Sequence, residues 1–456
     1  MVRPLFPVLF PVRPLFPVES WYVPYFPQSW YVPYFLAISF GPLSFPYPIL
    51  TPSNWTRFKA ALESEREAND ARRRTMKEGE EGNLNDTLAS RIDYHRARPE
   101  VTTDQYVDAC RIQLGREVCA KRKVYLDTKF WILLREVLLQ RNAQPEVIDL
   151  YSALSDGLRA GTLICPISAT TFLEIYKQQD AKTRQATVAL VDELSLGVSL
   201  ADHFERARTE LSYLLHTLGG HPDLHELDNL VWTKVSFVLG VTHPTNTPYS
   251  EVDERAIQKA FFDHMWSLPM ATMEEHLGGK HFPSMDYEGL AEKLNAENAT
   301  HADECMSFEQ LYRNEFMGGI EISAPVVAPV MERWYAEVTG LREHYSPSLA
   351  KQTETMLLSI LSEAIKKNDF RRTLRTAHIG ALCHASLRWD KKRKLDGNWL
   401  HDFHHAEGAV GYCDLFLTEK PLAAILKQKH LKLEEVFPCT IINSPVDAFR
   451  AVAQIA

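Results

Sequence analysis

The sequence predicts an α/β fold with a mainly parallel sheet that is interrupted by a large, mostly helical insertion. Two observations support this class. Short apolar runs alternate with helical patterns at residues 122–200 and again at 396–456, and the stretch 201–395 is helical almost throughout. Because strands and helices alternate on both sides of the insertion, we expect these strands to join in one sheet. A chain of 456 residues is long enough for two or three domains.

The composition is that of an ordinary globular protein, with 45% hydrophobic and 24% charged residues. The net charge of -9 argues against a protein that coats nucleic acid, although it leaves room for a local basic patch. The seven cysteines never form a C-x-x-C pair, which predicts a reduced, cytoplasmic protein without a zinc ribbon. Prolines interrupt every apolar run before it reaches the roughly 18 residues of a membrane span, so we expect no membrane association.

The first 121 residues show two patterns. Residues 1–50 repeat the motifs PLFPV and SWYVPYF, and proline at this density predicts extended, polyproline-like chain. This segment is either an aromatic, proline-rich interaction tail or a translated tandem repeat upstream of the true start, and we favour the second interpretation. Residues 51–121 are charged and prone to form helices with solvated faces.

The predicted α/β domain begins with the run KVYLD. Its β-forming residues indicate a buried strand over 124–127, so that Asp127 delivers a carboxylate to the C-terminal edge of the sheet, where α/β proteins bind ligands. Asp127 can equally be the N-cap of the helix that begins near Thr128. Two helices, a second short strand and a third helix complete a β-α-α-β-α pattern. After the insertion, strands are expected at 415–418 and 440–443, each followed by a helix.

Three further acidic residues are candidate partners of Asp127. Glu174 lies in the helix of SATTFLE between apolar neighbours, where an unpaired buried charge would be costly; an exposed helix glutamate is the alternative. Asp402 lies near the start of the helix HDFHHAEGAV, and Asp414 immediately precedes the strand LFLT. Their order along the chain places one partner near Asp127 and two beyond the insertion.

These motifs resemble the framework of the PIN-domain nucleases. The resemblance rests on YLDTKFWI, SATTFLE, the D-x-x-x-A pattern that begins at Asp402, and CDLFLTEKPLA followed by TIINSPVDAF. It covers residues 124–200 and 396–456. It implies a three-layer α/β/α domain in which Asp127, Glu174 and Asp402 bind metal.

One position departs from the family pattern. Many members carry T-x-D after the last core strand, whereas this chain has Thr418-Glu419-Lys420. Either Asp414 or Glu419 therefore takes the place of the fourth acid, or the site has three strong ligands. We rank Asp414 first, because it stands at the start of a strand beside the helix of Asp402.

Clustered carboxylates imply a metal ion. They raise each other's pKa values unless a divalent cation neutralises them, and ligands that are all oxygen favour Mg²⁺ or Mn²⁺. Such an ion activates water for phosphodiester hydrolysis without a covalent intermediate. We predict a metal-dependent nuclease that acts on RNA, as most of the resembling proteins do; the alternative is a catalytically silent scaffold that binds RNA or a protein. Residues expected to support the ligands or the substrate are Thr128, Thr171, Thr418 and His404.

A basic window, residues 366–394, precedes the helix of Asp402 and could hold a nucleic-acid backbone near the metal. The alternative is a solvated helix face. The nucleic-acid contacts predicted from this window are Arg371, Arg372, Arg375, Lys391, Lys392 and Arg393. A protein inhibitor or a second copy of the chain is a further expected partner.

Two other patterns point to different phosphodiesterases. The histidine cluster His401, His404 and His405 could bind a metal, or could contact the ligands or the substrate instead. His401-Asp402 is also similar to the motif of HD-type phosphohydrolases, but the other His and Asp ligands of that family have no convincing match here. The segment from Arg372 to His378 fits the Arg-spacer-His pattern of HEPN ribonucleases, which is common by chance. No G-x-x-x-x-G-K phosphate loop and no G-x-S-x-G elbow occurs in the sequence.

Overall fold

The structure is a computed structural model, and the part of the chain that it describes begins at residue 88. The described residues are 88–141, 144–220, 224–277, 287–301, 306–322 and 370–455, with a few positions between 330 and 363. The repetitive segment predicted at 1–50 and the first part of the charged segment, 51–87, lie outside the described residues.

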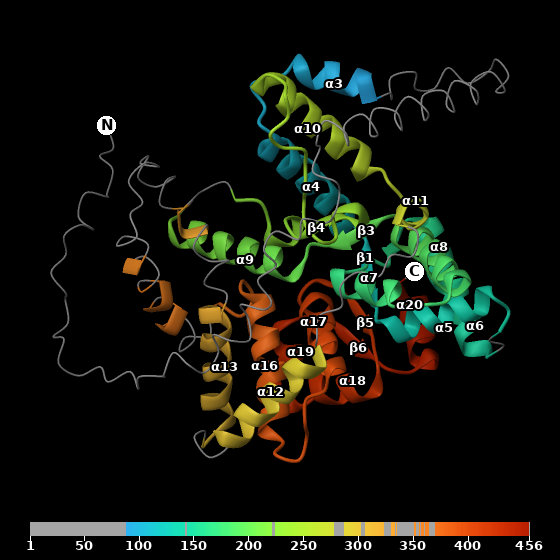
Figure 1. Ribbon diagram of the computed structural model, residues 1–456. Coiled ribbons are helices and arrows are strands. Elements are labelled where there is room, and N and C mark those ends of the chain that lie inside the picture. The colour runs from blue at the N-terminus through green and yellow to red at the C-terminus, as the bar shows by residue number, and fades with distance from the viewer. Residues whose placement is uncertain are drawn as a thin grey trace. The chain divides into compact units, whose positions relative to one another are not determined.

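Four short parallel strands form the central sheet, in the order β2-β1-β5-β6 (Figure 1). Their bounds are Arg122–Leu126 for β1, Leu163–Ile164 for β2, Leu415–Leu417 for β5 and Thr440–Ile442 for β6. In the centre of the sheet, Val124 pairs with Leu415 and Leu126 pairs with Leu417. Strands from both sides of the insertion thus join in one sheet, and the predicted α/β class is confirmed.

The side chains of these strands alternate between two cores. Tyr125 and Phe416 belong to one core, whereas Leu126 and Leu417 belong to the other. Parallel strands are buried on both faces, which is why the run Val124 to Leu126 is apolar without interruption. Helices therefore cover both faces of the sheet and give it three layers (Figure 1).

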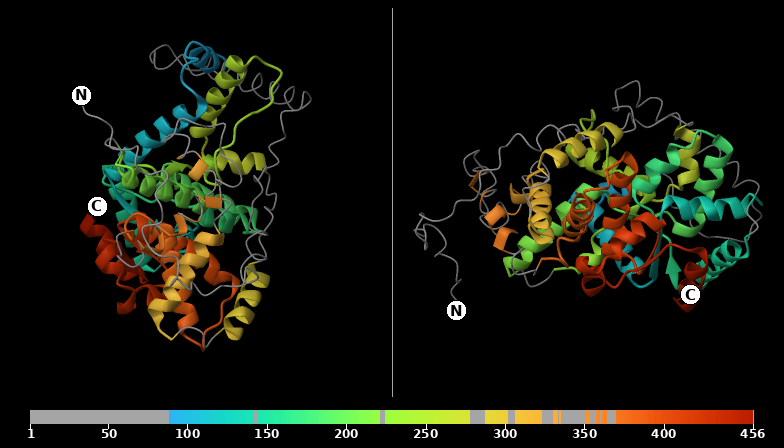
Figure 2. Two further views of the ribbon diagram at one scale, coloured as in Figure 1. Left: turned by 90° about the vertical axis from the view of Figure 1, so that its left-hand side faces the viewer. Right: turned by 90° about the horizontal axis from the view of Figure 1, so that it is seen from below.

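One face is covered by helices close in sequence to β1, together with the last helix of the chain. The bounds are Thr128–Leu138 for α5, Pro145–Ala160 for α6, Ala169–Tyr176 for α7, Ala181–Ser195 for α8 and Pro445–Ile455 for α20. The helix α20 packs along α6 (Figure 2). Proline at the first position of α6 and Gly161 with φ +74° just after it fix both ends of that helix.

The other face is covered by α4 and by the helices that flank β5. The bounds are Thr103–Cys119 for α4, Arg375–Trp389 for α16, Gly397–Tyr412 for α17, Lys420–Leu426 for α18 and Leu433–Val436 for α19. α16 is the last helix of the insertion and belongs to this layer, where it contacts two other helices of the insertion, α9 and α13. Phe316 of the insertion lies in the same core as Phe416 of β5, so the insertion and the sheet share apolar packing.

The insertion also contains elements that the helical pattern did not predict. Besides α16, the helices in the described part of the insertion are α9 (His203–Leu218), α10 (Glu251–Trp266), α11 (Met270–Leu277), α12 (Tyr287–Thr300) and α13 (Phe308–Ile322). A two-stranded antiparallel sheet joins β3 (Val198–Leu200), which lies just before the predicted start of the insertion, to β4 (Trp232–Lys234) within it. Each of these two strands contains a polar residue, so neither shows the uninterrupted apolar run that indicated β5.

The helix α3 (Leu88–Arg96) packs against α10, and α10 also contacts α4. The rings of Phe237 and Phe262 stack with their centroids 4.9 Å apart in a small core to which α4 and α10 contribute. Throughout the described part of the chain, no helix is both long enough and apolar enough to cross a membrane. The cysteines of the same part are free thiols.

Candidate metal centre

Asp127 lies at the end of β1 and caps α5 at the same time. Its carboxylate accepts a hydrogen bond from the N–H of Phe130 at 3.2 Å, and only 5% of the residue is exposed. Burial raises the pKa of Asp127 to about 6, partly opposed by the positive charge of His405. Asp127 is therefore both the residue that follows the strand and the N-cap of the helix, as the two interpretations of the sequence proposed. Thr418 is fully buried directly after β5, next to this carboxylate.

Glu174 on α7 reaches the same edge of the sheet. Its Oε2 accepts a hydrogen bond from the hydroxyl of Thr128 and lies 3.0 Å from Nε2 of His405 on α17. Burial acts to raise the pKa of Glu174, but these contacts with His405 and Thr128 lower it to about 2. Glu174 is thus an ionised carboxylate with a fixed orientation.

Asp402 lies on α17, one turn before His405. Burial raises its pKa to about 7, because the attraction of His405 is outweighed by burial and by the carboxylates of Asp127, Glu174 and Glu419. Four acids therefore repel one another at the carboxyl end of β1 and β5. They are Asp127 before α5, Glu174 on α7, Asp402 on α17 and Glu419 before α18. The three acids predicted first from the sequence come together here.

The fourth predicted acid, Asp414, lies elsewhere. It precedes β5, and parallel pairing with β1 places it at the opposite end of the strands. There its carboxylate accepts a hydrogen bond from the backbone N–H of Lys123 at 2.8 Å and lies 3.0 Å from NH1 of Arg122. The expectation that Asp414 joins the site is corrected: Glu419, which follows β5, is the acid near Asp402.

Two residues that sequence reasoning did not assign to the acid site hold it in place. The ring of His405 is fully buried, with Nδ1 2.7 Å from the hydroxyl of Tyr125. That hydroxyl also lies 2.6 Å from Oγ of Ser168 and 3.3 Å from Oγ1 of Thr171. Burial disfavours the charged imidazole, but Tyr125 and Glu174 raise the pKa of His405 well above its usual value. The spacing of three residues between Asp402 and His405 was the available signal.

His404, predicted to support the acids, contacts Glu407 instead. Within the described residues, the only group that brings three possible ligand atoms within 4.8 Å of one another is His203, His404 and Glu407, and this cluster could hold a metal ion. No three of the acids around Asp402 bring their carboxylate oxygens within this limit of one another. Wider spacing suits a cation such as Mg²⁺, which keeps several waters and binds few carboxylates directly.

A cation lies beside the acids. Lys177, one turn after Glu174, has its Nζ 2.7 Å from Nε2 of His401 on α17. Burial lowers the pKa of His401 to about 4, so the neutral imidazole accepts a hydrogen bond from the ammonium group. The ring of Tyr287 packs on His401 at 4.3 Å.

The predicted basic window does not form one patch. Arg371 and Arg372 precede α16, a 15-residue helix, and Lys391 follows it, so the two ends of the window are about 21 Å apart. The window also contains Arg375, but this residue is a structural ion pair. Its NH1 lies 2.6 Å from Asp228 and donates to the carbonyl of Gly411 at 2.8 Å, which corrects its assignment as a nucleic-acid contact.

The C-terminal half of the window lines a groove between α12 and the end of α16. Its volume is about 1270 Å³. The aromatic residue of the groove is Trp389, which is 48% exposed. The basic residues of the groove are Arg388, Lys391, Lys392, Arg393 and Lys394. Arg393 is partly neutralised by Asp390 at 3.1 Å.

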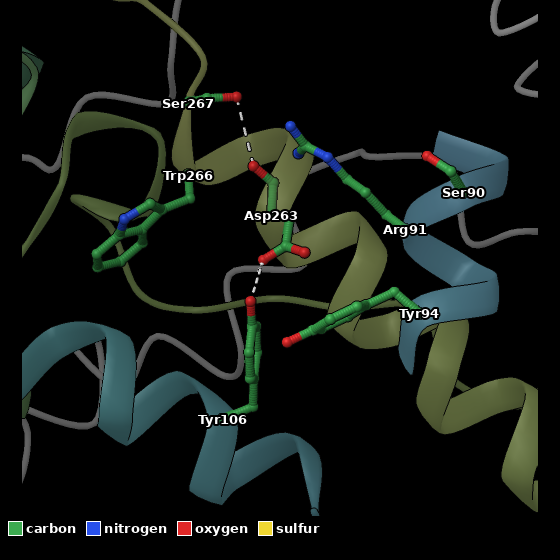
Figure 3. Close-up of a pocket in the computed structure, with 7 residues that line it drawn as sticks. All are labelled: Ser90, Arg91, Tyr94, Tyr106, Asp263, Trp266 and Ser267. Atoms are coloured by element: carbon green, nitrogen blue, oxygen red, sulfur yellow. Dashed lines mark hydrogen bonds between the residues drawn. The ribbon is translucent and has the colours of Figure 1, made fainter. Parts of the chain in front are cut away.

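A second hollow, of about 580 Å³, lies between α3, α4 and α10, away from the acids (Figure 3). Asp263 on α10 faces Tyr106 on α4, whose hydroxyl donates to the carboxylate at 2.6 Å. The other carboxylate oxygen lies 2.8 Å from Nε2 of His95. Both carboxylate oxygens of Asp263 have partners within the fold. Asp263 therefore links α10 to α3 through His95 and to α4 through Tyr106.

Comparisons with protein-family models, with curated protein sequences and with solved structures found no match to this chain. The function must therefore be argued from the geometry of the described residues.

Proposed function

We propose that the protein is a metal-dependent phosphodiesterase that cleaves RNA with Mg²⁺ or Mn²⁺ at a PIN-like acidic site. One observation carries the proposal. Asp127 and Asp402 are held near Glu174 and Glu419 at the carboxyl end of the sheet, and within the described residues no Lys or Arg forms an ion pair with any of them. His405 pairs with Glu174, but Asp127, Asp402 and Glu419 form no ion pair with a basic residue of the described chain. Carboxylates gathered in this way attract a cation from solution.

The residues of the chain suit this chemistry. A bound Mg²⁺ or Mn²⁺ would supply a water of lowered pKa and neutralise charge on the phosphate. Asp127 offers a buried oxygen ligand and Asp402 a half-buried one, and Glu174 is held in orientation by Thr128 and His405. Lys177 places an ammonium group one turn from Glu174, in reach of an anionic substrate.

The groove beside α16 supports single-stranded RNA as the substrate. Exposed aromatic rings stack on bases, while neighbouring lysines and arginines contact the phosphates. Trp389 and the exposed Lys392 and Lys394 provide both features in the segment that leads into α17. Asp402 lies in the second turn of that helix.

Substitution of the two raised-pKa acids tests the proposal. Asp127→Asn and Asp402→Asn should each reduce Mn²⁺-dependent cleavage of end-labelled single-stranded RNA by about 100-fold or more, since metal stabilisation contributes several kcal/mol. Glu435→Gln changes an exposed acid on α19 and is the matched control. Circular dichroism shows whether the variants are folded. Full activity in both folded Asp variants would exclude the proposed site.

A catalytically silent RNA-binding scaffold is the second candidate, favoured by the spacing of the acids, which exceeds that of a closed ligand set. Thermal unfolding with and without Mn²⁺ separates the two. A working site gives wild-type protein a rise in melting temperature that Asp127→Asn and Asp402→Asn lose. A silent scaffold shows no rise and binds RNA without cleaving it.

A further inference from the structure

We infer that His203, His404 and Glu407 form a second metal site, independent of the acidic one, that takes a transition-metal ion of the Zn²⁺ class. The site joins the first helix of the insertion, α9, to α17. This inference does not depend on the proposed nuclease function, because it uses different side chains.

The three side chains converge from two elements. His203 is the first residue of α9, and its Nδ1 lies 2.7 Å from Oε2 of Glu407. His404 lies one turn before Glu407 on α17, with Nδ1 3.1 Å from the same oxygen. Ligands of a tetrahedral Zn²⁺ with bonds of about 2.1 Å stand about 3.4 Å apart, so small rotations of the rings admit the ion.

The ligand chemistry selects the kind of metal. Two imidazoles and one carboxylate suit Zn²⁺ and related transition metals, whereas Mg²⁺ and Ca²⁺ prefer sites made of oxygen. Glu407 is buried, but the side chains of His203 and His404 are 26% and 30% exposed. Solvent thus reaches the imidazoles, and water can complete the coordination of the ion.

A glycine on the facing helix makes room for the carboxylate. A Cβ atom at Gly380 of α16 would lie 2.4 Å from Oε1 of Glu407. With hydrogen at this position, the carboxylate fits against α16 and turns its other oxygen toward the two imidazoles. The cation near His404 is Arg206. Its guanidinium group is held by the fold, because its NH1 donates a hydrogen bond to the carbonyl of Ala201 at 2.8 Å.

The site and the acids occupy different sides of α17. At about 100° per residue, the direction midway between His404 and Glu407 is about 170° around the helix from Asp402. His405 follows Asp402 toward the sheet and contacts Glu174. An ion at His203 would therefore hold α9 against α17 without occupying the acidic site.

Zinc titration of the full chain tests the site. After treatment with EDTA and dialysis, wild-type protein should bind one Zn²⁺ per chain by calorimetry, and Co²⁺ should give ligand-field absorption. His203→Ala should weaken Zn²⁺ affinity by more than about 100-fold, the upper range for loss of even an indirect ligand contact. Gly380→Ala should weaken it as well, because the methyl group displaces the end of a flexible side chain.

Two controls make the result specific. His225→Ala removes an exposed histidine, and the double variant Asp127→Asn/Asp402→Asn removes the acids; both should bind Zn²⁺ like wild type. The inference is overturned if folded His203→Ala and Gly380→Ala bind Zn²⁺ as wild type does. It is also overturned if the double variant loses the zinc, which would then belong to the acidic site.

Discussion

Acidic residues at the two ends of β5 have opposite electrostatic surroundings. At its amino end, the carboxylate of Asp414 lies 3.0 Å from Nζ of Lys123 and 3.0 Å from Arg122. Burial acts to raise the pKa of Asp414, but Lys123 and Arg122 lower it. Beyond the carboxyl end, burial raises the pKa of Asp127 to about 6 and that of Asp402 to about 7.

The difference identifies which acids serve the fold and which are open to a ligand. An acid with its own cation is a complete ion pair and needs nothing further. Acids that are buried together without such a partner keep protons or attract a cation from solution. The carboxyl end of β5 is thus the place for a metal, and the amino end is a structural contact.

Substitution of each candidate fourth acid in turn, Glu419 or Asp414, should give the largest difference in cleavage activity. Glu419→Gln should reduce Mn²⁺-dependent RNA cleavage by roughly 10- to 100-fold, or about 1.4–2.7 kcal/mol, because it removes a carboxylate near Asp402. Asp414→Asn should leave cleavage within about twofold but lower the free energy of unfolding by about 1–2 kcal/mol through weaker hydrogen bonds with Lys123. Initial rates and urea denaturation measure the two quantities. A folded Asp414→Asn protein without activity would reverse the comparison.

The sequence predicted three of the acids because each has a local signature. Asp127 ends an apolar run, Glu174 interrupts an apolar helix face, and Asp402 lies near the start of a helix. The fourth acid was assigned to the wrong end of a strand. In a parallel sheet the acids that meet Asp127 must follow their strands, as Glu419 follows β5, and Asp414 precedes it.

The remaining parts of the site depend on tertiary packing. Tyr125 looked like one more apolar strand residue, and only the fold shows its hydroxyl 2.7 Å from His405. The sequence could not decide between His404 and His405, because neighbouring residues on a helix face different directions and the orientation of α17 was unknown. Arg375 likewise looked like part of a basic surface until Asp228 was placed beside it.

The pH dependence of stability gives a smaller test of the same contrast. The folded-state pKa of Asp402 is about 7, against an ordinary value of 3.8 for aspartate, so the folded protein holds a proton that the unfolded chain releases between these values. The contribution of Asp402 to the free energy of unfolding of metal-free protein should therefore fall as pH rises from about 4 to 7. Relative to Asp402→Asn, which cannot titrate there, the fall should be about 1–2 kcal/mol after allowance for partial exposure.

Urea denaturation in EDTA at several pH values measures this difference. In saturating Mn²⁺ the trend should reverse, because protons and metal compete for the same oxygens and metal binding strengthens as pH rises. If the pH profiles of wild type and Asp402→Asn in EDTA are parallel, the pKa of Asp402 is not raised in the folded protein.

The smallest expected effect extends the contrast to the basic residues. Arg375 is bound to Asp228, whereas Lys392 and Lys394 are exposed in the groove beside Trp389. Lys392→Gln/Lys394→Gln should therefore weaken binding of single-stranded RNA and make it less sensitive to salt. Each lost phosphate contact lowers the slope of log affinity against log salt by about 0.7. Fluorescence anisotropy on the full chain, with cleavage blocked by EDTA, measures a total change of about 1.4.

The matched control removes two exposed cations from the opposite layer of the fold, in Arg159→Gln/Lys182→Gln. The net charge changes by the same amount in both double variants, so a general electrostatic effect would alter both slopes equally. Only a groove that follows the RNA backbone gives a larger change for Lys392 and Lys394. Equal changes would remove the groove from the substrate path and leave the acids as the sole support for a nucleic-acid substrate.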